Sequence, residues 1–193
     1  DVYKRQVNTV AARSDACADE GLVCIGGWWH PDPHRNPDSL SKADVFWFSE
    51  PIRLEDLPFR YLFTPEAMRE PHRLISMLEL LGILVLLKLS KRATVVFSAH
   101  VTQETDSMVC KHVTKKMYSS SAPIASVLQE LSFFCRQHRV ELHTGHVSGL
   151  KNEWADSLSR GQLDHFLERN REHEDVHDPE FWSTLCPPSP PYP

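Results

Sequence analysis

The pattern of apolar and polar residues predicts three strands near the start of the chain. We expect strands at 7–14, 21–29 and 43–49, because these stretches are rich in β-branched and aromatic side chains. Together these three consecutive strands suggest an antiparallel meander. Prolines and polar residues dominate much of 30–71, so we expect an irregular insertion around the third strand.

Helices and strands alternate in the second half. The apolar spacing predicts a helix at 72–90, a strand at 94–100, helices at 106–117 and 123–139, a strand at 140–147, and a last helix from Asn152 to about 160. Hairpin strands followed by such βα units predict an α/β fold with helices packed on a mixed sheet.

The two ends of the chain differ from this pattern. Residues 1–6 read like a translated sequencing adapter, so we exclude them and expect the chain to be a fragment of a longer protein. We place one domain at 7–160. Residues 161–193 are first acidic and then proline-rich, which predicts a tail that buries little surface.

Composition narrows the functional class. The chain is 41% hydrophobic and 24% charged, as in ordinary globular domains, and its net charge of −5 argues against binding nucleic acid by broad phosphate neutralisation alone. Five widely spaced cysteines suit a reducing compartment, so we expect an intracellular location in the cytoplasm or nucleus.

Glu79 is the most informative acid. It is the only acidic residue in the predicted helix 72–90, and apolar side chains surround it on all sides, as in a buried helix. A buried lone carboxylate costs several kcal/mol unless it is paired or binds a metal. Pairing with Lys88 is the ordinary alternative. A membrane span is not expected, since Glu79 interrupts a run that is too short to cross a bilayer.

Three further acids stand at the boundaries or faces of predicted elements. Asp15 ends the first strand, Asp106 opens a helix, and Asp156 lies one turn before Arg160 in the last helix. Each has an ordinary alternative: Asp15 could be a turn residue, Asp106 a helix N-cap, and Asp156 a partner in an i,i+4 ion pair. Together with Glu79, however, they stand where elements of one sheet could converge on a single rim.

Four short motifs carry a resemblance. They are Ser-Asp-Ala at 14–16, Met-Leu-Glu-Leu at 77–80, Thr-Asp-Ser at 105–107, and the run 146–160 with His146, Gly149, Asn152, Ala155 and Asp156. This set resembles the type 1 ribonuclease H family, especially the domains in retrotransposon polyproteins of DIRS-like elements. The resemblance covers about 7–160. It implies a ribonuclease H-like mixed five-stranded sheet, with three antiparallel strands, then two parallel ones, and helices on both faces.

The resemblance also implies an activity. Asp15, Glu79, Asp106 and Asp156 would hold two Mg²⁺ or Mn²⁺ ions and hydrolyse the RNA strand of an RNA–DNA hybrid. His146, on a mobile loop, would assist proton movement or product release. A reverse transcriptase domain would lie upstream in the parent polyprotein, and no membrane partner is expected.

Basic residues near these motifs suggest a track for phosphates. The candidate nucleic-acid contacts are Lys111, Lys115, Lys116, Arg136, Lys151 and Asn152. The ordinary alternative is a solvated surface. Trp28, Trp29 and Trp47 are either core residues or stacking platforms.

Three rival interpretations remain open. The first is a zinc site formed by Cys135, His138, His143 and His146, although a helix and a strand would have to bring these ligands together. The second is a 3′-exonuclease with an Asp-x-Glu motif, which Cys17 contradicts at the position of the Glu. The third is a catalytically inactive, connection-type module that acts as a structural or interaction platform.

Overall fold

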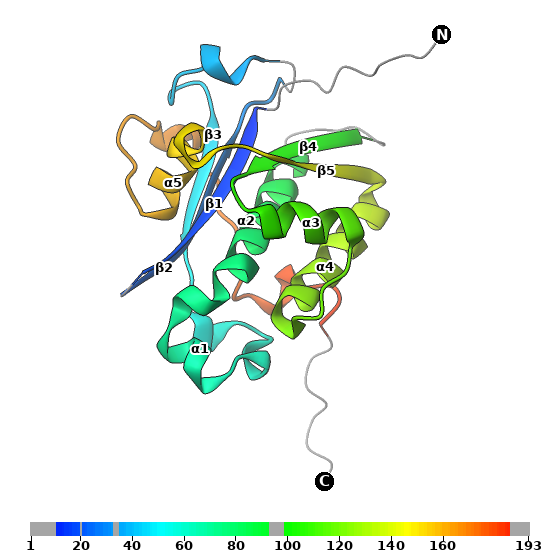
Figure 1. The fold of residues 1–193 in the computed structure, drawn as a ribbon. Helices are drawn as coiled ribbons and strands as arrows, with labels where there is room; N and C mark the ends of the chain where they lie inside the picture. Colours follow the sequence, from blue (N-terminus) through cyan, green and yellow to red (C-terminus); the bar gives the residue numbers. More distant parts are fainter. Residues whose placement is uncertain (1–10, 20, 33–34, 93–98, 186–193) are drawn as a thin grey trace.

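The computed structural model describes residues 11–19, 21–32, 35–92 and 99–185, and its centre is one five-stranded sheet (Figure 1). The strands are β1 (Ala12–Asp19), β2 (Leu22–Trp29), β3 (Phe46–Pro51), β4 (Ala99–Thr105) and β5 (Val140–His146). Their order is β3-β2-β1-β4-β5, with β1 to β3 antiparallel and β4 and β5 parallel to β1. The predicted fold class is therefore confirmed.

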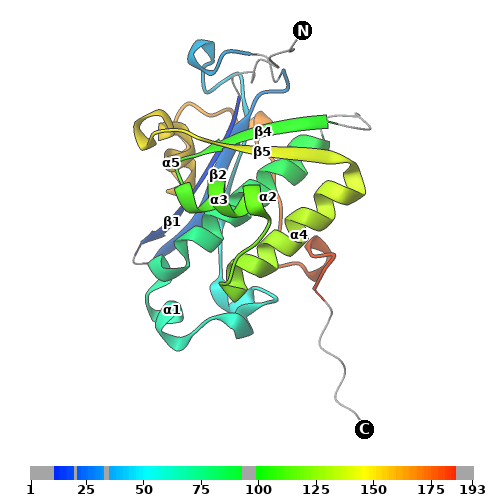
Figure 2. The same cartoon turned by 45° about the vertical axis from the view of Figure 1, so that its right-hand side comes forward.

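Helices cover both faces of this sheet (Figures 1 and 2). They are α1 (Pro65–Arg69), α2 (Ile75–Arg92), α3 (Met108–Lys116), α4 (Ala122–His138) and α5 (Glu153–Ser159). The short helix α5 packs on β1, β2 and β3, whereas α2 crosses the other face and contacts β1, β2 and α4. No helix in the described ranges is long and apolar enough to cross a membrane.

Helix α2 is the centre of the larger core. Eleven of its eighteen residues are buried, as the apolar pattern around Glu79 predicts. A smaller core under α5 contains Trp28 and Trp47 together with Leu158. Trp28, Trp29 and Trp47 are each at most 3% exposed, so they are core residues rather than stacking platforms.

Two predicted strands are displaced. The first runs from Ala12 to Asp19, so Asp15 lies within the strand rather than at its end. Its small side chains obscured the strand signature, yet they allow α2 and α5 to pack closely on both faces. The fourth strand is Ala99–Thr105 instead of 94–100, and 94–98 lie outside the described residues. Its alternating polar residues were less conspicuous than the apolar run before them.

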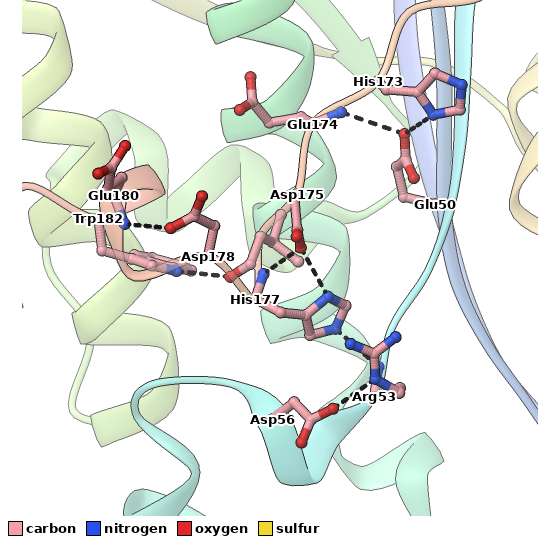
Figure 3. Close-up of polar contacts among 11 residues, drawn as sticks. Glu50, Arg53, Asp56, His173, Glu174, Asp175, His177, Asp178, Glu180 and Trp182 are labelled. Atoms are coloured by element: carbon pink, nitrogen blue, oxygen red, sulfur yellow. Dashed lines mark hydrogen bonds and ion pairs between the residues drawn. The ribbon is translucent and has the colours of Figure 1, made fainter.

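The C-terminal segment corrects a second prediction. Residues 161–185 are not a tail, because Phe166, Val176, Phe181 and Trp182 are buried in the two cores. Figure 3 shows the polar contacts of this segment, in which Glu50 accepts hydrogen bonds from the backbone of Glu174 and lies 3.1 Å from His173 Nδ1. Aromatic residues among the acids supply enough apolar surface for this packing. Residues 1–6 and 186–193 lie outside the described part.

The irregular insertion is also part of the core. Residues 30–71 contain β3, short 3₁₀ turns and α1, and they bury Ile52, Leu57 and Phe59. Prolines shape these turns without excluding apolar side chains from the interior.

Gly26 offers a test of the packing between α5 and the sheet. A Cβ atom there would lie 2.4 Å from the backbone of Leu158 and of Ser159. We expect Gly26→Ala to lower the free energy of unfolding by at least about 2 kcal/mol in urea denaturation. The control is Gly82→Ala, whose Cβ would meet Ser14 at an ordinary 3.5 Å and which should be neutral or stabilising. Equal effects of the two substitutions would contradict this packing.

Candidate metal centre

Three of the four predicted acids lie together. Asp15 on β1, Glu79 on α2 and Asp106 after β4 each offer a carboxylate oxygen, and these oxygens lie within 4.8 Å of one another. The strand register explains the meeting of the two aspartates. Arg13 pairs with Glu104 across the parallel strands, and Asp15 and Asp106 each follow two residues later, so they share a face. Glu79 reaches the same point from α2.

Burial and like charge act on the central carboxylate. Asp15 is 7% exposed, and desolvation by burial, followed by repulsion from Asp106, raises its pKa to about 7. Desolvation also raises the pKa of Glu79, while hydrogen bonds from Ser107 and from Cys110 act in the opposite direction. The group therefore carries electrostatic strain that a cation would relieve.

Asp156 stands beside this close group but outside it. Its Oδ1 accepts a hydrogen bond from Arg160 Nε at 2.9 Å, and Arg160 also donates to Asp19. The ordinary i,i+4 ion pair is thus present. Even so, the charge of Asp156 contributes to the raised pKa of Asp15, so it belongs to the same electrostatic environment.

The ordinary alternatives for two other acids do not occur. Ser107, not Asp106, is the N-cap of α3, and its hydroxyl accepts from the backbone of Cys110. Lys88 pairs with the buried Glu130 at 3.2 Å instead of with Glu79. Asp106 is therefore not the N-cap of α3, and Glu79 is not the partner of Lys88.

Asn152 lies inside this centre. It is 1% exposed, and its Nδ2 donates to the Ser14 carbonyl at 3.3 Å and to Asp106 Oδ1 at 3.5 Å. Although it occupies the N-cap position of α5, its side chain makes no capping hydrogen bond. This burial suits a residue that positions Asp106 better than a direct contact to nucleic acid.

The exposed candidates divide into two groups. His146 is the last residue of β5, so it belongs to a strand rather than to a loop. Its cross-strand partner is Thr105, the residue directly before Asp106. The backbone of Lys151 lies close to β1, because its carbonyl accepts a hydrogen bond from Arg13, two residues before Asp15. Arg136 occupies the last turn of α4, which leads into the opposite end of β5.

The lysines of α3 extend away from the centre. The helix begins at Met108, directly after the acids, and Lys115 and Lys116 are exposed in its last turn while Lys111 is half-buried. A nucleic-acid backbone bound at the carboxylates could therefore run along these lysines.

The predicted zinc set is not assembled. Cys135 is buried in α4, whereas His143 and His146 stand at odd and even positions of β5 and so point to opposite faces. Among the described residues, the only two groups with metal-ligand spacing are the carboxylates above and a group of His100, Glu141 and His143.

Sequence reasoning missed the residues that support the acids. Ser159 donates to Asp15 Oδ2 at 3.4 Å, and Cys110 Sγ lies 3.9 Å from Glu79 Oε2. Ser159 lies within the Ala-Asp-Ser-Leu-Ser-Arg run, but nothing in its spacing marks it as a partner of a residue on β1.

Comparisons with known proteins add little to this geometry. No family model matches the chain, and no curated protein matches it. Among solved structures, the crystal structure of RNase H1 from the halophilic archaeon Halobacterium salinarum NRC-1 is similar over 81% of this chain and 98% of that chain, at 13% identity and a TM-score of 0.49. Similarity at this level decides nothing about activity, so the functional inference rests on the topology and the carboxylates.

The raised pKa of Asp15 predicts a pH dependence of stability. An unfolded Asp carboxyl loses its proton near pH 4, whereas the native one holds it to about 7. Between these values the native state binds more protons, so the stability of the metal-free protein falls as the pH rises. We expect the free energy of unfolding of Asp15→Asn to exceed that of the wild type by at most about 4 kcal/mol at pH 8. Near pH 4 the two free energies should be equal.

Urea denaturation in EDTA from pH 4 to 8 measures this difference. The exposed Asp38 provides the control, since Asp38→Asn should follow the wild-type profile throughout. If the free energy of unfolding of the wild type and of Asp15→Asn changes with pH in the same way, the pKa of the buried Asp15 carboxyl is not raised.

Proposed function

We propose that this domain is a metal-dependent endonuclease that hydrolyses the RNA strand of RNA–DNA hybrids. The observation that supports it is the convergence of Asp15 on β1, Glu79 on α2 and Asp106 just after β4. The run at 146–160 with its resemblance to retrotransposon ribonucleases H supplies the substrate class and a place downstream of a reverse transcriptase in a polyprotein.

The donor atoms fit the proposed cofactor. All three groups are carboxylates, which suit Mg²⁺ or Mn²⁺, and the strain on Asp15 is of the kind that such a cation removes. Asp15, Glu79 and Asp106 would hold the metal, with Asp156 completing a two-ion site. When bound, the ions activate water and stabilise the leaving oxygen of the phosphodiester.

Other residues of the chain orient the reacting groups. Asn152 fixes the Asp106 carboxylate against β1 through the Ser14 carbonyl. His146 is exposed beside Asp106, where its imidazole can take up or release a proton near the scissile phosphate. Lys151, Lys115 and Lys116 would contact phosphates, and contacts to 2′-hydroxyl groups would distinguish the RNA strand from DNA.

Asp106→Asn tests the catalytic role of the carboxylates. Because the substitution removes a metal ligand without changing its shape, we expect Mg²⁺-dependent cleavage to fall at least about 100-fold while hybrid binding stays near wild type. The measurement uses a uniformly labelled RNA–DNA hybrid. Asp38→Asn, an exposed acid of the same type, should cleave as the wild type does.

The products separate this proposal from its rivals. Internal cuts in the RNA support it, whereas mononucleotides released from one end would indicate an exonuclease. If the wild type and Asp106→Asn are equally inert with Mg²⁺ and with Mn²⁺, the domain is instead an inactive structural or interaction module.

Lys115 and Lys116 test the proposed phosphate track. Each lysine that neutralises a phosphate adds about 0.9 to the slope of log affinity against log salt. We expect the double alanine variant to bind the hybrid more weakly and to lower this slope by about 2 in fluorescence anisotropy titrations. Arg69→Ala removes an exposed cation on α1 and should leave the slope unchanged. An unchanged slope in the double variant would show that these lysines are solvated surface residues that do not contact the phosphates.

A further inference from the structure

A second group with metal-ligand spacing lies away from the carboxylates. His100 on β4 and Glu141 and His143 on β5 each offer one ligand atom, and these atoms lie within 4.8 Å of one another. The residues at the other ends of the same strands, Thr105 and His146, lie next to Asp106. Five strand positions at about 3.3 Å each place the two groups roughly 17 Å apart.

The strand register produces this group. His100 is the direct cross-strand partner of Glu141, and His143 follows Glu141 by two residues on the same face. That face is the one on which α5 packs, but α5 contacts β1, β2 and β3. The three side chains are therefore reachable from solvent, with exposed fractions of 55%, 61% and 56%.

Contacts of Glu141 hold the three side chains of this group together. Glu141 lies between the imidazoles, with Oε2 2.8 Å from His100 Nδ1 and Oε1 3.2 Å from His143 Nε2. Around a tetrahedral zinc ion with bonds of about 2.0–2.1 Å, neighbouring ligand atoms are about 3.4 Å apart. The two contacts use different oxygens of Glu141, so one of these oxygens would move toward both imidazoles when a cation enters. The three ligand atoms, which lie within 4.8 Å of one another, would then close to about 3.4 Å.

We propose that His100, Glu141 and His143 bind one transition-metal cation of the zinc class. Two imidazoles and one carboxylate prefer Zn²⁺ over Mg²⁺, and three protein ligands leave a fourth position open to water. Since β5 is the edge strand of the described sheet and pairs with β4, the cation would fasten this edge to the rest of the sheet. The site is independent of the proposed nuclease activity.

Titration of the full chain with ZnCl₂ in excess MgCl₂ tests the site by calorimetry. We expect saturable binding of one Zn²⁺ at this group, weakened at least tenfold by His100→Ala and by His143→Ala. His72→Ala is the matched control, because His72 is an exposed histidine 3.8 Å from Glu70 and should leave the affinity unchanged. Repeating the titration in Asp15→Asn excludes the carboxylate centre, and the affinity should persist there.

Hydrogen exchange provides a readout that surface adsorption would not change. Zn²⁺ should slow exchange of the amides that join β4 to β5 near His100 in the wild type, and should have no such effect in His143→Ala. Absence of saturable binding, equal affinity in the wild type and both histidine variants, or loss of binding in Asp15→Asn would overturn the proposal, as would unchanged exchange on zinc addition.

Discussion

Repulsion among buried carboxylates is the constraint around which the centre of this molecule is organised. Asp15 is almost fully buried beside Asp106 and Glu79, and burial and like charge together favour its protonated form. A fold selected for stability alone would avoid this arrangement, since an apolar residue on β1 would cost nothing in desolvation. Hydrogen bonds from Ser159 to Asp15, from Ser107 to Glu79 and from Asn152 to Asp106 limit the cost without neutralising the charges. A divalent cation is the natural counterpart of such a site.

Helix α5 covers only part of one face of the sheet, and polar side chains on the uncovered part stay accessible to solvent. Helix α5 is only seven residues long and packs on β1, β2 and β3, so β1 is buried on both faces. The outer strands β4 and β5 expose His100, Glu141 and His143 on one face, whereas Gln103 and Thr105 of β4 are buried on the other. The boundary between the covered and open parts lies at β1 and β4, next to the carboxylates.

Local pattern was sufficient for the order and type of the five strands and of helices α2 to α5, but it missed α1 and did not fix the limits of the elements. The apolar surroundings of Glu79 identified a buried helix, and α2 confirms it. The Asp15 strand was misplaced because serine, alanine and cysteine carry little strand propensity, although close packing of two helices requires such small side chains. Residues 161–185 look like a tail in the sequence because seven of them are acidic. In the structure, however, Phe181 and Trp182 of this segment are buried.

The sequence by itself determined which residues have the chemistry to bind a metal. Tertiary structure decided which of them meet. It brought Asp15, Glu79 and Asp106 together, turned Asp156 toward Arg160, dispersed the predicted Cys135 to His146 set, and joined His143 to His100 instead. The reason is that periodicity reports only local backbone geometry. The pairing register between strands distant in the chain fixes long-range proximity, and a shift of one residue in that register would reverse every face.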